Sequence, residues 1–211
     1  MQRNISTIQS GLKKKVIMKN ILTLFAVAAA ALLFCGCASP DPVVFSEVLQ
    51  LQKNQKIYTA WNLWYDSSCK IDSRNVQQGS FLPLGTEIEP VSADNNSRKI
   101  VFTAGGKTYT INFDSGIRLC TMRDFIGYTF TVKTKEELLK DIPSEIRQRI
   151  VRGEVVPGMD RRQVELAYGP VPAARTPDTR NETWVYWTSD TKTLRLIFRG
   201  DVVRQILDAG I

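Results

Sequence analysis

An apolar run from Ile21 to Phe34, with Thr23 as its one polar residue, limits which part of this 211-residue chain can belong to a folded core. The run is 14 residues long, whereas an α-helix needs about 20 apolar residues to cross a bilayer. Its length, the preceding Lys19 and the small residues that follow are typical of a secretory signal peptide, with anchoring by the helix itself as the alternative. We therefore expect residues 1–36 to be removed on export, with residues 1–17 either an over-called start or an extended positive end of the signal.

The end of this run, Phe34-Cys35-Gly36-Cys37, resembles a bacterial lipobox. In that motif an apolar residue and two small residues precede a cysteine whose sulfur is lipidated. Gly36 fits, while Phe34 and Cys35 stand where leucine and a small residue are usual. The resemblance implies cleavage before Cys37, lipidation of Cys37 and, because Ala38 follows it and not aspartate, a place on the periplasmic face of the outer membrane. A metal site is the weaker alternative, since the chain has no histidine and no second close cysteine pair.

The formal charge of +7 comes mostly from the segment that we expect to be removed. Five of the 28 basic residues and none of the 21 acidic ones lie in residues 1–36, which leaves 23 basic against 21 acidic residues. A nucleic-acid-binding protein needs a clustered basic face. We therefore expect no nucleic acid among its partners.

Two cysteines, Cys69 and Cys120, remain after the signal. An exported protein meets an oxidising compartment, so an even pair in one β-rich segment favours a disulfide. The alternative is two buried free thiols. A catalytic thiol has less support, because the chain holds no histidine to activate it and no CxxC motif.

The remaining chain divides by pattern into a tether at 37–55, a β-rich domain at 56–132 and an α+β domain at 133–211. Strands are expected at 56–65, 81–90 and 128–132, and as a hairpin over 98–113, where Gly105-Gly106 supplies the positive φ angles of a tight turn. Short strands joined by short turns indicate a small barrel or curled sheet, and the pattern is similar to SH3-like barrels.

The α+β domain begins with two predicted helices, at 135–141 and 144–152. A third starts at its N-cap Asp160, with Gln163 as the capping-box partner, and ends at Gly169-Pro170. Three strands follow, at 182–188, 193–199 and 202–207, and they predict an antiparallel sheet.

From Val155 onward the order of motifs resembles the SmpA/OmlA (BamE-like) family. The resemblance rests on Gly158-Met159-Asp160, on Gly169-Pro170 and on the Trp-x-Tyr of the first strand. It implies an outer-membrane lipoprotein that assists β-barrel assembly or supports envelope integrity, with a module of two helices and three strands. The preceding β-rich domain is a departure from that family pattern.

Trp184, Tyr186 and Trp187 give the first of these strands three aromatic side chains. A sheet covered by helices on one face leaves its other face and its edge free, and aromatic residues are typical interface anchors. We therefore expect at least one of the three to bind a partner. The alternative is that all of them pack in the core.

The sequence carries no catalytic motif, and we expect no enzyme activity, no cofactor and no metal. Glu136-Glu137 and Glu87-x-Glu89 are typical of solvated faces, and GxSxG, Walker and HExxH patterns are absent from the sequence. Three functions stay open: an outer-membrane assembly or scaffold lipoprotein, a periplasmic protein-binding inhibitor or sensor, as in β-lactamase inhibitor proteins of similar fold, and a peptidoglycan-binding module.

Overall fold

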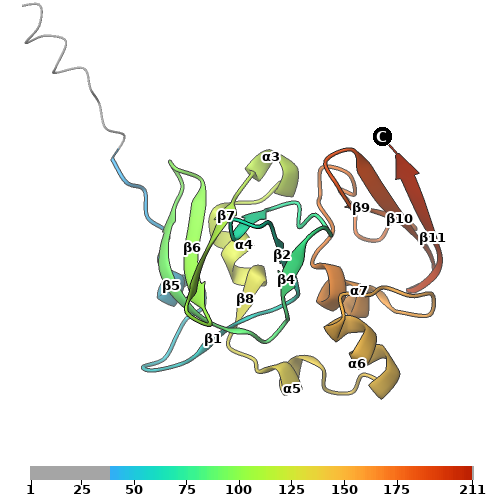
Figure 1. Cartoon of the computed structure of the whole chain (residues 1–211), viewed down its shortest axis with the longest axis horizontal. Helices are drawn as coiled ribbons and strands as arrows, with labels where there is room; N and C mark the ends of the chain where they lie inside the picture. Colours follow the sequence, from blue (N-terminus) through green and yellow to red (C-terminus); the bar gives the residue numbers. More distant parts are fainter. Residues whose placement is uncertain (1–38, 211) are drawn as a thin grey trace, which may run out of the picture. The chain divides into compact units, whose positions relative to one another are not determined.

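The computed structural model describes residues 39–210, and from Pro40 onward the chain forms one compact unit. This unit has a mixed α and β fold, in which a curled, mostly β part is followed by helices and a second sheet (Figure 1). The predicted α+β class is confirmed. The helices are α2 (Phe45–Val48), α3 (Ser115–Arg118), α4 (Met122–Thr129), α5 (Lys135–Leu138), α6 (Ser144–Val151) and α7 (Arg161–Tyr168). The strands are β1 (Ile57–Thr59), β2 (Leu63–Tyr65), β3 (Lys70–Asp72), β4 (Ser80–Leu82), β5 (Glu87–Asp94), β6 (Lys99–Ala104), β7 (Lys107–Asn112), β8 (Phe130–Thr131), β9 (Thr183–Trp187), β10 (Lys192–Arg199) and β11 (Val202–Gly210).

The first sheet has six strands in the order β3-β7-β6-β5-β1-β8, and β2 and β4 pair separately. Its centre is the predicted hairpin of β6 and β7, whose turn residues Gly105 and Gly106 have φ angles of +54° and +76°. Both angles lie in the region that glycine adopts without steric cost. The alternation on β7 buries Tyr109 and Ile111 on one face, as their spacing predicts.

Helix α4 lies in a segment for which the sequence analysis named no element, and its end overlaps the predicted strand at 128–132. Thr121 and Asp124 form a capping box that starts the helix. Phe125 and Ile126 are fully buried on its inner side. Tyr128 and Thr129 therefore end a helix, and the predicted strand at 128–132 shrinks to the two residues of β8.

The second part follows its predicted order closely. Asp160 accepts a hydrogen bond from the backbone N–H of Gln163 at 2.8 Å, and the capping box is complete. The strands β9, β10 and β11 form an antiparallel sheet in the order β11-β10-β9. Helices α6 and α7 contact each other and share one hydrophobic cluster with this sheet. The three predicted strands are confirmed, and the last one extends further than expected, to Gly210.

Two hydrophobic clusters lie within the compact unit. The first is built from residues between Phe45 and Phe130, and the second from Leu84 and residues between Leu138 and Val203. The change from one cluster to the other falls near the domain boundary predicted at 132/133. Independent folding of the two parts stays a prediction. Part of the predicted tether is folded, because Phe45 is 5% exposed and belongs to the first cluster.

Buried asparagines join the two clusters. Asn62 donates to the carbonyl oxygens of Ile150 at 2.7 Å and Ala167 at 3.0 Å, and its Oδ1 accepts the N–H of Leu84 at 2.8 Å. Asn75, with a φ of +55°, donates from its amide to the carbonyl oxygens of Asn62 and Tyr168. These bonds cross from the β2 region to the ends of α6 and α7, so they hold the second sheet in one position relative to the first cluster.

Candidate protein-binding surface

Trp184 and Tyr186 lie inside the second cluster. Their side chains are 1% and 0% exposed and stand on the face of the sheet that the helices cover. The Trp184 Nε1–H donates to the Thr179 carbonyl at 3.0 Å, and the Tyr186 hydroxyl donates to the Gly169 carbonyl at 2.9 Å. Desolvation raises the pKa of Tyr186 well above its ordinary value. Neither side chain offers a surface to a partner, so the alternative of core packing holds for these two residues.

Trp187 points to the opposite face of the sheet and is half-buried. The guanidinium carbons of Arg74 and Arg175 each lie 5.2 Å from the centre of its indole ring. Its carbonyl oxygen accepts the N–H of Gln77 at 2.9 Å. Trp187 therefore has cationic neighbours that hold it in place, and of the three aromatic residues it alone keeps partial access to solvent.

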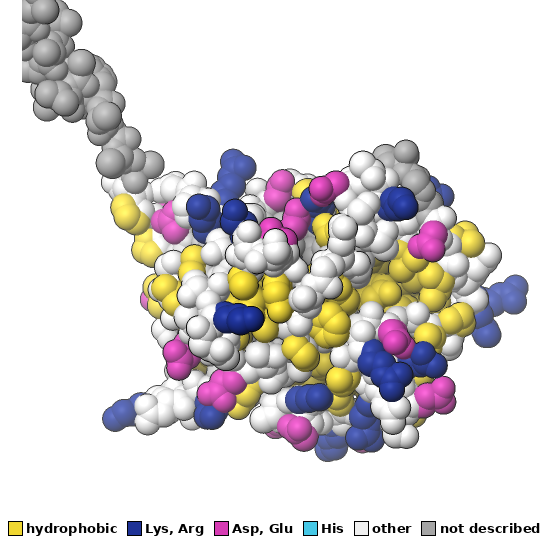
Figure 2. Space-filling model, viewed as in Figure 1, with side chains coloured by type: hydrophobic (Ala, Val, Ile, Leu, Met, Phe, Trp, Pro, Cys, Tyr) yellow, Lys and Arg dark blue, Asp and Glu magenta, His cyan; other side chains and the backbone are white. Residues whose placement is uncertain are grey.

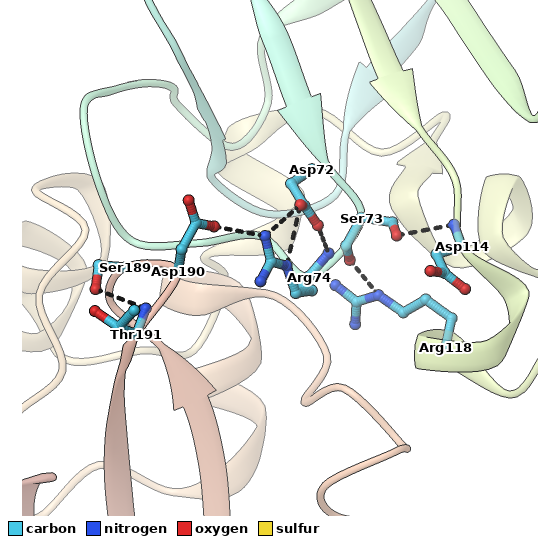
Figure 3. A network of polar contacts seen from close by, with 8 residues as sticks. All are labelled: Asp72, Ser73, Arg74, Asp114, Arg118, Ser189, Asp190 and Thr191. Carbon is cyan, nitrogen blue, oxygen red and sulfur yellow. Dashed lines mark hydrogen bonds and ion pairs between the residues drawn. The ribbon is translucent and has the colours of Figure 1, made fainter. Parts of the chain in front are cut away.

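Arg74 connects this tryptophan to an ion-pair network that the sequence did not indicate. Its guanidinium donates to Asp72 Oδ2 at 2.7 and 3.0 Å and to Asp190 Oδ1 at 2.8 Å (Figure 3). These bonds, those to Asp72 first, raise the pKa of Arg74. Asp190 comes from the turn between β9 and β10, and its side chain is 86% exposed. An ion pair so exposed contributes little to stability.

An open cleft of about 510 Å³ lies beside this network. Its charged lining consists of three acidic side chains, Asp66, Asp72 and Asp190, and two basic ones, Lys70 and Arg74. Two of these acids already bond Arg74, and Asp66 accepts the backbone N–H groups of its own turn. The three carboxylates of the cleft are thus already hydrogen-bonded within the protein.

Arg118 is buried beneath the junction of the two parts. Its guanidinium donates to the carbonyl oxygen of Ser73 (Figure 3). It also donates to the Pro170 carbonyl at 2.6 Å and lies 5.5 Å from the ring centre of Phe125. Desolvation by burial lowers its pKa. Pro170, which the sequence predicted only as a helix stop, therefore also accepts a hydrogen bond from Arg118 in the first part of the chain.

The remaining motif residues support the second sheet. Gly158 donates its N–H to the Val203 carbonyl at 2.9 Å, and the Met159 carbonyl accepts the Val203 N–H at 2.8 Å. Met159 is fully buried, and Asp160 caps α7. Gly169 has a φ of +79° and packs against Trp61 so closely that a Cβ there would lie 2.5 Å from the ring. These residues shape the module and do not form a binding site.

Strand β11 is an open edge of the second sheet. Near its start, Val203 directs its N–H and C=O to Gly158 and Met159, away from β10. After the bulge next to Phe198, the register places Ile206 opposite Leu196 and Asp208 opposite Leu194. Because the backbone groups of alternate residues in an antiparallel ladder face outward, those of Ile206 and Asp208 point away from β10. In residues 39–210 no other element bonds them.

The opposite edge of this sheet is covered. The Val185 N–H donates to Thr176 Oγ1 at 3.2 Å, and the Trp187 carbonyl accepts from Gln77. A row of unpaired backbone groups is a template for pairing with another chain. Of the two edges of this sheet, β11 is thus the one that can accept a further strand.

The outer face of the sheet is basic and partly apolar. Arg195, Arg199 and Arg204 are exposed, and Leu207 is 40% exposed. Asp208 is the one acidic residue in β9, β10 and β11, and its register opposite the buried Leu194 places it on the helix-covered face. The outer face therefore suits a partner that offers acidic and apolar side chains.

The predicted disulfide is absent. Cys69 and Cys120 are both free thiols, partly buried against the first cluster. Cys69 belongs to the turn between β2 and β3 with a φ of +57°, whereas the Cys120 sulfur lies 3.2 Å from the Tyr128 hydroxyl. Each thiol packs in its own environment, so the alternative of two free thiols describes this structure. The predicted lipidation site, Cys37, lies outside the described residues.

Comparisons with protein-family models, with curated proteins and with solved structures found no match. In the described part of the chain, no helix is both long and apolar enough to span a bilayer. Within residues 39–210, no three histidine, cysteine or acidic side chains gather closely enough to hold a metal ion.

Proposed function

We propose that this chain is a lipoprotein of the outer membrane that acts as a non-catalytic, protein-binding accessory or scaffold in outer-membrane assembly or envelope integrity. The anchor is Cys37, on the lipobox resemblance of Phe34 to Cys37. Two or more acyl chains hold a protein stably at a membrane, whereas one holds it only marginally. The lipid thus supplies localisation, and the folded unit supplies recognition.

The open β11 edge is the observation that carries this proposal. Ile206 and Asp208 present free backbone donors and acceptors along this edge. The side chain of Ile206 is half-buried, and that of Leu207, between the two residues, is exposed. A partner strand added there would pair with this backbone and cover apolar side chains on both faces. Backbone pairing supplies affinity, and the arginines of the outer face favour acidic side chains on the partner.

The finer architecture is part of the proposal. A helix pair followed by three antiparallel strands, with Gly158-Met159-Asp160 at the start of α7, is consistent with a BamE-like module. The curled sheet of the first part is consistent with an SH3-like barrel. On that basis, components of the β-barrel assembly machinery are the partners to test first.

The test uses a proline that blocks the edge without removing a ladder bond. The N–H of Asp208 faces away from β10, so Asp208→Pro removes an outward donor and leaves the β10–β11 bonds in place. Asp208→Ala is the matched control, because it removes the same carboxylate and keeps the donor. Both are expressed as tagged full-length chains beside the parent and Cys37→Ser, and are crosslinked in the native envelope and purified.

We expect barrel-assembly proteins to co-purify with the parent and with Asp208→Ala, to fall at least fivefold with Asp208→Pro, and to disappear with Cys37→Ser. Equal recovery with the proline and alanine variants would show that the edge is not used. Recovery of peptidoglycan or a soluble periplasmic enzyme alone would replace the scaffold function with one of the other two.

A further inference from the structure

An apolar patch lies where the described part of the chain begins. Val44 is 44% and Val91 is 60% exposed, and they are two of the four large hydrophobic side chains exposed in residues 39–210. Figure 2 shows hydrophobic side chains at the surface of this end of the described chain. They border an open groove of about 550 Å³ whose apolar lining includes Pro42, Val43, Val44, Leu51, Pro90 and Val91.

The exposure of Val91 has a local cause. The pairing of β5 with β6 shifts register between Pro90 and Ser92, so Val91 has no partner opposite it. A bulge of this kind redirects a side chain out of the regular alternation. Val91 is thus the unpaired residue of the bulge, and its side chain is 60% exposed.

The chain that leads to the patch is fixed to the same strand. The Asp41 N–H donates to Asp94 Oδ2 at 2.7 Å, and the Val43 N–H donates to the Ala93 carbonyl at 2.9 Å. The Asn95 N–H in turn donates to the Asp41 carbonyl at 2.9 Å. Residues 41–43 therefore belong to the folded unit and cannot lengthen the tether.

This attachment leaves a short link to the predicted lipid site. Three residues lie between Cys37 and Asp41, which makes four steps along the chain, and a fully extended chain spans at most about 3.6 Å per step, or about 14 Å here. The hydrocarbon core of a bilayer is about 30 Å thick. With Cys37 acylated, Asp41, which adjoins Pro42 of the apolar patch, therefore lies within about 14 Å of the lipidated residue, about half of that thickness.

We propose that this patch docks on the surface of the bilayer that holds Cys37, with Val44 and Val91 in the interfacial region. The proposal rests on the lipid anchor of the proposed function and adds a fixed orientation to it. In Figure 1, β5 and β11 lie on opposite sides of the described unit. Docking through the β5 end therefore directs the open β11 edge away from the membrane, where a partner can reach it.

The test measures membrane contact at two positions of the full, lipidated chain. Val91→Trp places an indole in the patch, and Leu207→Trp places one at an exposed apolar position on β11. Each protein is reconstituted into phosphatidylcholine vesicles with acyl chains that are either brominated, which quenches nearby indoles, or unbrominated. The parent corrects for the four native tryptophans. Vesicle flotation and the mass of the N-terminal peptide report the anchor independently, with Cys37→Ser as its control.

We expect bromination to reduce the emission of the indole at position 91 at least twofold and to leave that at position 207 unchanged. Equal quenching at the two positions in proteins that float would overturn the docking and leave the anchor intact. Protection of position 91 from iodide without quenching by bromine would assign the patch to a second copy of the chain and would also overturn it. An unacylated N-terminus in a chain that does not float would overturn the anchor and the docking together.

Discussion

Asn62 is the side chain whose loss should weaken the junction between the two hydrophobic clusters most directly. It is fully buried and makes three hydrogen bonds to backbone groups of residues in the second cluster. In Asn62→Ala, the Ile150 carbonyl keeps a second partner in the Gly153 N–H at 2.9 Å. The Ala167 carbonyl and the Leu84 N–H lose the side-chain partner that they have in this structure.

The cost follows from those two groups. Leaving a buried backbone donor or acceptor without a partner costs about 1–3 kcal/mol. Asn62→Ala should therefore lower the free energy of unfolding by about 2–6 kcal/mol, a large part of the 5–15 kcal/mol that is typical of a domain at roughly this size. With a urea m-value of about 1–3 kcal/mol per molar, the unfolding midpoint should fall by about 2 M.

Urea unfolding of residues 38–211, followed by tryptophan emission, measures this shift, because Trp61 and Trp64 flank the site and are 3% and 7% exposed. Asn181→Ala, at an exposed loop position, is the control and should change stability by less than about 0.5 kcal/mol. If Asn62→Ala shifts the midpoint no more than this control, the asparagine bonds do not hold the junction.

Asn62→Asp separates hydrogen bonding from packing, since the two side chains have nearly the same shape. Its carboxylate would face the Ile150 and Ala167 carbonyl oxygens, which raises the pKa of the new carboxyl in the folded state. The destabilisation should be fully present above that folded pKa and shrink as the pH falls toward the unfolded value of about 4. A deficit that does not change between pH 7 and pH 4 would contradict the assigned hydrogen bonds.

Two further predictions concern residues that the sequence singled out. Gly169→Ala should lower the urea midpoint clearly more than Gly158→Ala. Both glycines have a positive φ, but only at Gly169 would a Cβ meet a neighbour, the Trp61 ring at 2.5 Å. Equal effects would show that backbone conformation alone matters there. After unfolding in an alkylating buffer without reductant, Cys69 and Cys120 should both be labelled, as mass spectrometry would show; a chain two mass units lighter that takes up no label would restore the disulfide.

The sequence was sufficient where a feature depends on neighbouring residues. Gly105-Gly106 predicted the central hairpin, Asp160 and Gln163 predicted the start of α7, and three alternating segments predicted the second sheet. A turn, a cap or a strand period involves groups within a few positions of one another, so propensity and spacing carry most of the information.

Features that depend on distant residues were decided only by the tertiary structure. The period of two in β9 separates Trp184 and Tyr186 from Trp187, but it does not say which face the helices cover. Nothing in the local sequence distinguishes Asn62 from other polar residues. Its hydrogen-bond partners, the carbonyl groups at the ends of α6 and α7, lie 88 and 105 positions later in the chain. An edge is likewise a property of strand order, so the free backbone of β11 follows only from the arrangement β11-β10-β9. Burial, pairing and the choice of the open edge arise from contacts between segments, which local pattern does not encode.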